Sequence, residues 1–100
     1  MKVIRINTPK GQFDVHLKLV AENRADYYIV EKDGLTKESK EYQEEVDWVV
    51  EDGDEGVDWI QNNSDWVDWE NVATKVNDDV NTTDEDFWSD SDDFQIIDLD

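Results

Sequence analysis

The sequence contains no cysteine, one proline and four glycines among its 100 residues. Without cysteine, the chain has neither a disulfide framework nor a thiolate metal site. Its apolar runs are far shorter than the roughly 20 residues that cross a bilayer, and its first residues lack the apolar region of a signal peptide. These absences predict a soluble protein that stays in the cytoplasm of the cell that makes it.

Cations are nearly absent from the second part of the chain. Residues 1–40 carry eight Lys or Arg and six Asp or Glu, a net charge of +2. Residues 41–100 carry one cation, Lys75, and 22 acids, a net charge of −21, which gives −19 in total. Because nucleic acid and anionic lipid bind through Lys and Arg, the sequence predicts no direct contact with either, and an attraction to basic protein surfaces.

Catalytic motifs are also lacking. The chain has a single histidine, His16, no cysteine nucleophile and no glycine-rich phosphate loop. Its 28 acids form pairs at every spacing, so the sequence distinguishes no pair as a general acid and base. We therefore expect a protein that is not an enzyme and needs no cofactor.

A calcium loop is the chemical motif that comes nearest to a match. Asp52, Asp54 and Asp58 have a suggestive spacing, but an EF-hand that starts at Asp52 requires glycine in sixth place and glutamate in twelfth. Those places hold Val57 and Asn63, so an EF-hand is excluded and only weak, generic binding of divalent cations stays open. A second acidic group fits no ligand spacing better: Asp84, Asp86, Asp90, Asp92 and Asp93.

Hydrophobic periodicity predicts a hairpin followed by two helices. Apolar residues partly alternate in residues 2–7 and 12–17 around a turn at residues 8–11, which indicates a β-hairpin. From Lys18 to Glu31 they recur at three- and four-residue steps, which predicts a helix that ends at Asp33-Gly34. A second helix is expected from Thr36 or Ser39 to Glu51, with Tyr42, Val46, Val49 and Val50 as its buried stripe.

A Val-Asp-Trp triplet occurs three times, ending at Trp48, Trp59 and Trp69. Offsets of eleven and ten residues would place the three tryptophans on nearly one face of an unbroken helix, at about 100° per residue. Glycines at positions 53 and 56 and the Asn62-Asn63-Ser64 run predict breaks. We expect successive short helices, the last of them capped by Asp65. Each would present a tryptophan to one shared core, and this includes Trp48. The alternative is that the triplet recurs by chance.

The fold class follows as α+β. The expected parts are an N-terminal hairpin packed by two main helices and short tryptophan-bearing helices, with one or two further short strands. A strand or extended segment is expected near residues 70–77 and a last strand at residues 94–97. Residues 1–77 would form the compact core, residues 78–93 an acidic loop held by Phe87 and Trp88, and residues 94–100 a strand and tail of the same domain.

Three parts of the chain carry a resemblance to a known group of proteins. They are the helix Leu19–Tyr28 with the sequence LVAENRADYY, the turn Asp68–Val72 with the sequence DWENV, and the acidic end. Together they resemble small uncharacterised acidic proteins encoded by tailed phages of marine cyanobacteria, over most of the chain. The resemblance implies a phage origin and expression inside a bacterial host, and it implies no activity or site.

Two functions fit these properties. The first is a small non-enzymatic accessory protein that acts by protein–protein interaction and keeps an acidic, solvated face. The second is an acidic decoy that mimics nucleic acid and inhibits a basic host protein that binds DNA or RNA. The residues expected to take part in binding are the acids of the second helix and the loop after it, with Trp88 as an anchor: Glu41, Glu44, Glu45, Glu51, Asp52, Asp54, Glu55 and Trp88.

Overall fold

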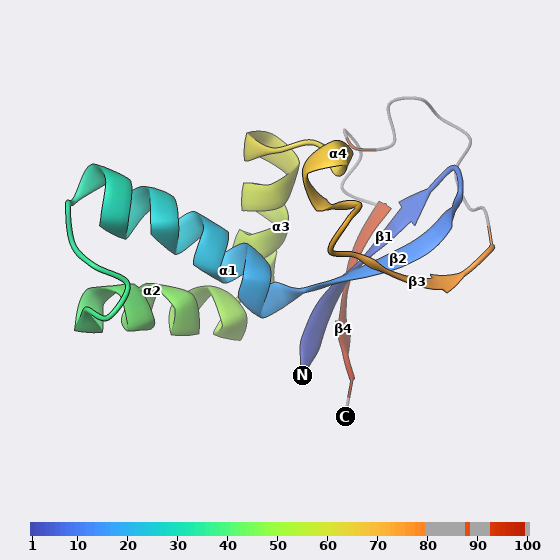
Figure 1. The fold of residues 1–100 in the computed structure, drawn as a ribbon. Helices are drawn as coiled ribbons and strands as arrows, with labels where there is room; N and C mark the ends of the chain where they lie inside the picture. The colour runs from blue at the N-terminus through green and yellow to red at the C-terminus, as the bar shows by residue number, and fades with distance from the viewer. Residues whose placement is uncertain (80–87, 89–92, 100) are drawn as a thin grey trace.

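The computed structural model describes residues 1–79, 88 and 93–99. Figure 1 shows a β-sheet at one end of the molecule and a pair of helices, α1 and α2, at the other, with α3 standing between them. Helices and an antiparallel sheet occur together, so the predicted α+β class is confirmed. The acidic loop predicted at residues 78–93 lies largely outside the described residues, because residues 80–87 and 89–92 are not among them.

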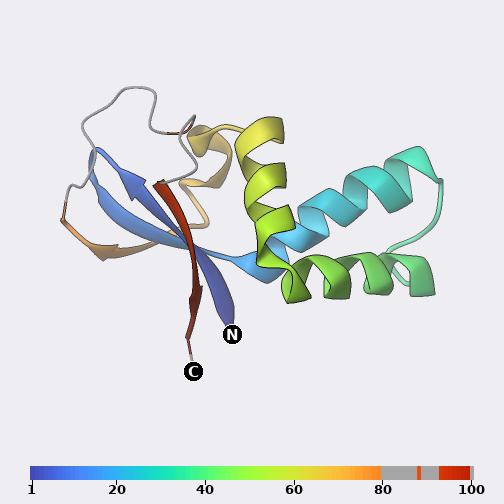
Figure 2. The same cartoon turned by 180° about the vertical axis from the view of Figure 1, so that it is seen from behind.

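The sheet has four antiparallel strands in the order β3-β2-β1-β4. They are β1 Lys2–Thr8, β2 Gly11–His16, β3 Thr74–Asn77 and β4 Phe94–Asp98. The predicted hairpin is confirmed, since Ile4 pairs with Val15 and Ile6 with Phe13. Both ends of the chain lie side by side, because the first strand pairs with the last (Figure 2).

Four segments form the helical part after the hairpin. Helix α1 spans Leu17–Ala25 and continues as a π-helix, η1, over Asp26–Lys32; α2 spans Lys40–Glu51, α3 spans Gly53–Asn63 and α4 spans Trp66–Trp69. Leu17 was expected in the second strand and instead begins α1. The predicted helix over residues 18–31 is present, but its second half has the wider π geometry, which apolar periodicity does not reveal.

Local capping explains where the next helices begin. Ser39 precedes α2 and its side chain accepts a hydrogen bond from the backbone N–H of Tyr42, at 3.2 Å. Asp65 and Asp68 form a reciprocal capping box around the start of α4. Gly53 begins α3, as the predicted break requires, and the short helix expected over residues 54–62 is confirmed; Gly56 lies inside it and is buried, so it does not interrupt the helix.

The core consists of two neighbouring clusters. One joins the sheet to α1, α3 and α4: Ile4, Ile6, Val15, Leu17, Val20, Trp59, Ile60, Trp69 and Phe94. The other fills the space between α1, η1 and α2: Ala21, Ala25, Ile29, Tyr42, Val46 and Val49. Together they bury one apolar face of each main helix, which is what fixes the polar face of α2 toward solvent.

The three triplet tryptophans do not share one core. Trp59 and Trp69 are 8% and 6% exposed and belong to the first cluster, as predicted. Trp48 is 46% exposed, so the prediction that it packs into the core is wrong. The reason is its position on α2, where it lies two residues, or about 200°, from the buried Val46.

Candidate protein-binding surface

Four of the predicted acids lie on one face of α2, around Trp48, and a fifth, Asp52, directly follows the last residue of the helix. Relative to Trp48 they occupy positions −7, −4, −3, +3 and +4, which places each within about 60° of the tryptophan around the helix axis. Tyr42, Val46 and Val49 occupy the opposite side and are buried. We call this surface the α2 outer face: Glu41, Glu44, Glu45, Trp48, Glu51 and Asp52.

Nearby cations compensate only part of this charge. Arg24 of α1 forms an ion pair with Glu45, and Lys40 lies 3.6 Å from Glu44 in a pair whose two side chains are mostly exposed. Within the described part of the chain, Glu41, Glu51 and Asp52 form no ion pair. The end of α2 is therefore the least compensated part of the α2 outer face.

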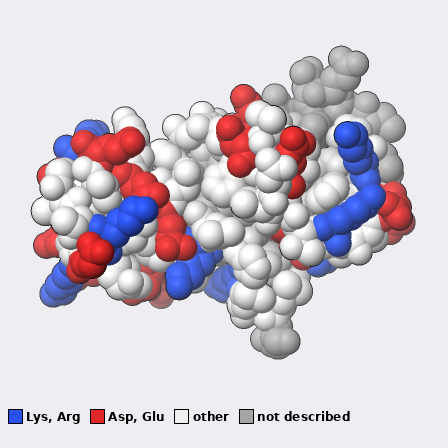
Figure 3. Space-filling view, in the orientation of Figure 1, with Lys and Arg blue, Asp and Glu red and all other residues white. Residues whose placement is uncertain are grey.

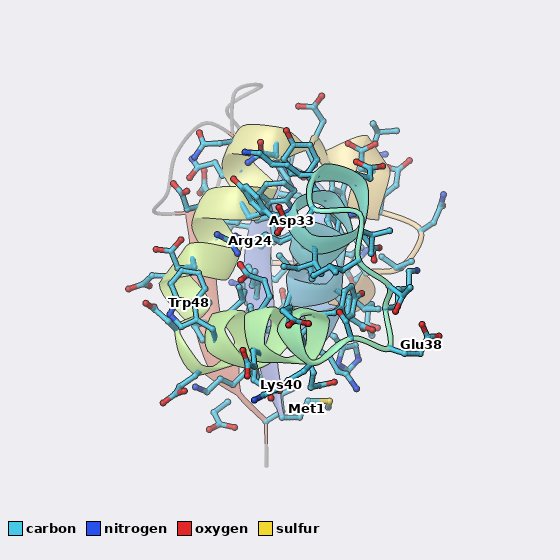
Figure 4. The ribbon with its side chains drawn as sticks, turned by 90° about the vertical axis from the view of Figure 1, so that its left-hand side faces the viewer. Met1, Arg24, Asp33, Glu38, Lys40 and Trp48 are labelled. Carbon is cyan, nitrogen blue, oxygen red and sulfur yellow. The ribbon has the colours of Figure 1, made fainter. Side chains whose placement is uncertain are left out.

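Trp48 is held in place by Arg24. The guanidinium carbon of Arg24 lies 5.1 Å from the centre of the Trp48 ring and 4.7 Å from that of Tyr28, so the guanidinium contacts both aromatic rings. Figure 4 shows Trp48 at the outer edge of the helices, with Arg24 deeper between them. Because Glu45 also pairs with Arg24, the cluster fixes the indole while leaving about half of it exposed.

Asp54 and Glu55 lie beyond the corner, in the first turn of α3. Acids there interact favourably with the helix macrodipole, which gives both residues a structural reason to be acidic. Asp54 is exposed and Glu55 is half-buried. They extend the negative charge of the α2 outer face around the corner, but they are not on that face.

Trp88 lies in another part of the molecule. Its indole N–H donates to the backbone oxygen of Ser64 at 2.7 Å, and its ring is 5.1 Å from Phe94 and 6.3 Å from Trp66. Trp88 is half-buried and packs against the first core cluster. The structure thus places the predicted tryptophan anchor beside the sheet, apart from the acids with which it was grouped.

Figure 3 shows the face of the molecule with α1 toward the viewer, on which acidic and basic side chains are mixed over the α1–α2 end. An open groove of about 840 Å³ runs along α1 there, between Lys37 and Tyr42 on one side and Ser64 and Trp69 on the other. In it the Tyr42 hydroxyl donates to Asp26 at 2.9 Å. Burial, followed by this hydrogen bond, raises the pKa of Tyr42 to about 12.

Weak binding of divalent cations is the further possibility that the sequence leaves open for the acids, besides the accessory protein and the decoy. Among residues 1–79, 88 and 93–99, no three Asp, Glu or His side chains are grouped so that they could hold a metal ion. Asp52, Asp54 and Asp58 therefore do not form such a group. Of the second predicted group, only Asp93 is among the described residues.

Comparisons with known proteins give no family. No protein-family model, curated protein or solved structure matches this chain. In the part of the chain that the structure describes, no helix has the length and apolar character needed to span a membrane.

The residue that sequence reasoning missed is Trp48. Helical periodicity held the necessary signal, because the stripe Tyr42, Val46 and Val49 defines a buried direction that excludes Trp48. The triplet repeat favoured the opposite interpretation and assigned all three tryptophans one role. The charge of the neighbouring positions supports the exposed placement, since acids surround Trp48 along the helix.

Proposed function

We propose that this protein is a small non-enzymatic accessory protein that binds a basic protein partner through the α2 outer face. The observation that carries the proposal is the gathering of five acids around one exposed tryptophan on the α2 outer face, in a stretch of residues 41–74 that contains no Lys or Arg. The sequence resemblance extends the proposal to a phage-encoded protein that acts in the cytoplasm of a bacterial host.

The position of these acids supports a role beyond solubility. Glu51 lies in the last turn of α2, which contains no basic residue, and Asp52 follows it. A carboxylate in the last turn of a helix opposes the macrodipole and costs about 0.3–1 kcal/mol, which applies to Glu51, whereas Asp52 is also the N-cap of α3 and there meets the favourable end of that helix. Acids that served only solubility could occupy positions where they stabilise the fold.

A decoy that mimics nucleic acid is the second candidate, and the spacing of the acids favours it. The five carboxylates from Glu41 to Asp52 span about 17 Å at 1.5 Å per residue, or roughly one charge per 3–4 Å. One strand of B-form DNA carries a charge every 3.4 Å or so, and the duplex one per about 1.7 Å. The row therefore matches one strand better than two, and the partner would then be a host protein that binds DNA or RNA.

The test is retention of bacterial proteins on the immobilised full-length chain at about 0.1 M and about 0.5 M salt. It compares the wild type with a variant in which four acids of the α2 outer face are neutralised: Glu41→Gln, Glu44→Gln, Glu51→Gln and Asp52→Asn. A control variant loses the same charge at four exposed positions elsewhere: Glu31→Gln, Asp33→Asn, Glu70→Gln and Asp79→Asn. Glu45 is kept in both because it pairs with Arg24.

The proposal expects a basic protein that the wild type and the control retain at low salt and that the outer-face variant loses. Equal loss in both variants would show an effect of net charge alone and would contradict the proposal. Addition of single-stranded or duplex DNA separates the two candidates. Displacement of the retained protein by DNA supports the decoy, whereas retention in the presence of DNA supports an accessory protein with another kind of basic partner.

A further inference from the structure

We infer that Trp48 is the anchor of the α2 outer face and that its exposed ring face binds an arginine side chain of the basic partner. The inference rests on the proposed function and names its specificity-determining residue. Trp48 is 46% exposed, while Trp59 and Trp69 are buried and Trp66 and Trp88 are half-buried. Exposed tryptophans surrounded by polar residues are typical of the centres of protein interfaces.

The structure already contains an arginine bound in this way. The Arg24 guanidinium carbon lies over the Trp48 ring, 5.1 Å from its centre, and Arg24 pairs with Glu45, which precedes Trp48 by three residues. A ring face next to a carboxylate is the arrangement that recognises a guanidinium, because the ring quadrupole and the carboxylate both attract it. Arg24 therefore demonstrates, within the chain, the contact that the exposed side of Trp48 offers to another molecule.

The exposed side of Trp48 has its own carboxylates. Around the helix axis Glu45 lies about 60° to one side of Trp48, whereas Glu44 and Glu51 lie about 40° and 60° to the other. Glu44 is four residues before Trp48 and Glu51 three residues after it, so both are one turn away along the helix. An arginine on this side would meet the ring and one or both carboxylates.

Arginine fits this surface better than lysine. Its planar guanidinium can stack on an indole and donate two parallel hydrogen bonds to a carboxylate at the same time, whereas an ammonium group is a compact and strongly hydrated charge. The positive charge of Arg24 does not prevent this, because Glu45 compensates it and the Tyr28 ring also contacts the guanidinium. The surface thus selects for the type of cation as well as for the sign of its charge.

The test uses two capped peptides of equal length and charge, one with four arginines and one with four lysines, each separated by glycines. Their affinities for the full-length protein are measured by calorimetry at low salt. We expect the arginine peptide to bind about tenfold more tightly, and Trp48→Ala to remove this preference. The matched control is Tyr27→Ala, an aromatic residue of the same exposure, at 44%, that lies on η1; it should keep the preference.

Each outcome distinguishes the inference from the proposed function. If both peptides bind equally, or if Trp48→Ala binds like the wild type while the outer-face acid variant does not, Trp48 is not the anchor and the acidic surface remains the binding site. If neither peptide binds, both proposals fail. If Trp48→Ala does not fold, the indole N–H signals of the wild type are followed by nuclear magnetic resonance during addition of the arginine peptide. The inference requires the Trp48 signal to shift, and it fails if that signal stays in place.

Discussion

Gly56 of α3 packs directly against Leu17, the first residue of α1. A Cβ atom built at position 56 would lie 2.5 Å from Leu17 Cδ1, well inside the distance at which carbon atoms repel each other. Val49 and Ile4 would be the next neighbours, at 3.6 Å and 3.7 Å. The glycine thus allows α3 to approach α1 and the sheet at the point where the helical end of the molecule joins the sheet.

Replacement of Gly56 by alanine should destabilise the protein, although alanine is the better helix former. Overpacking a core costs about 1–3 kcal/mol, while alanine in place of glycine regains about 1 kcal/mol of helix propensity. Leu17 is fully buried and has little room to move, so we expect a net loss of about 1–2 kcal/mol in the free energy of unfolding. Denaturant unfolding followed by circular dichroism measures it.

A double variant provides the control for this prediction. Leu17→Ala removes the atom that the new methyl group would meet, so adding Gly56→Ala in that background should be neutral or stabilising. If Gly56→Ala costs the same in both backgrounds, contact with Leu17 is not the cause of its effect.

Arg5 and Asp14 form a cross-strand ion pair. Removing one partner alone should destabilise the protein more than removing both. Arg5 Nε donates to Asp14 Oδ1 at 2.9 Å and Arg5 Nη2 donates to Asp14 Oδ2 at 3.0 Å, and both side chains are largely buried. The hydrogen bonds to Asp14 raise the pKa of Arg5 above its ordinary value. Arg5→Met leaves the carboxylate of Asp14 without its partner and should cost about 2–4 kcal/mol.

The double variant Arg5→Met, Asp14→Leu should be more stable than Arg5→Met alone, because it leaves no uncompensated charge. Thermal unfolding of the wild type, Arg5→Met, Asp14→Leu and the double variant gives the comparison. Lys40→Met, which breaks an exposed ion pair with Glu44, serves as the reference and should change stability by less than about 1 kcal/mol. If Lys40→Met reduced stability as much as Arg5→Met does, burial would not explain the larger effect expected for the Arg5–Asp14 pair.

Tyr42 should make stability fall at high pH. Its pKa in the folded protein is about 12, above the ordinary value of 10.0, so the folded state holds this proton more tightly than the unfolded state. The stabilisation is fully present below pH 10 and is lost as the pH rises toward 12, at up to about 1.4 kcal/mol per pH unit. Unfolding by denaturant at several pH values between 9 and 12 would show this decline.

Tyr42→Phe removes the titrating hydroxyl and isolates its contribution. The variant should lose about 1 kcal/mol at neutral pH, where the hydrogen bond to Asp26 is missing, and its stability should decline less steeply than that of the wild type above pH 10. Parallel curves for the two proteins would show that Tyr42 is not responsible for the decline.

Glu51 should reduce the stability of the fold. It lies in the last turn of α2, where no basic residue compensates the helix C-terminus. Glu51→Lys should therefore raise the free energy of unfolding by about 0.5–1 kcal/mol, with a smaller gain at high salt. Glu55→Lys, in the first turn of α3, should have the opposite sign for the same electrostatic reason. Thermal unfolding at two salt concentrations tests both substitutions, and equal signs would contradict the role given to the helix ends.

The local elements of the fold could be predicted from the sequence because their causes are local. Alternation in residues 2–7 and 12–17 indicated the hairpin, and Asp65 indicated the start of α4. Thr36 and Ser39 were the two candidates for the start of α2, and the structure selects Ser39. The order of strands has no comparable signal, since the position of β4 beside β1 depends on contacts between opposite ends of the chain. The π-helical turn of η1 likewise leaves no pattern that differs from an ordinary helix.

The candidate site could be predicted in part. The acids from Glu41 to Asp52 were identified from charge alone, and helix geometry then determined that they share one face. Trp48 was expected in the core but is 46% exposed, and Trp88 was expected as an anchor for a partner but is half-buried, because residue type alone does not say which tryptophan is buried. The decisive information for Trp48 is the direction of the α2 core stripe, and for Trp88 it is the contacts with Trp66 and Phe94, which no local pattern records.

The place of β1 between β2 and β4 has a consequence for the order in which the sheet forms during synthesis. The ribosome makes β1 first and β4 last, and at about 5–20 residues per second roughly 5–20 s separate them. During that interval the hairpin and helices can assemble, while the edge of β1 that pairs with β4 stays unpaired. Translation that stops before Phe94 would leave this edge of β1 unpaired, so we expect quality-control proteases to remove such a fragment and to spare a chain that includes β4.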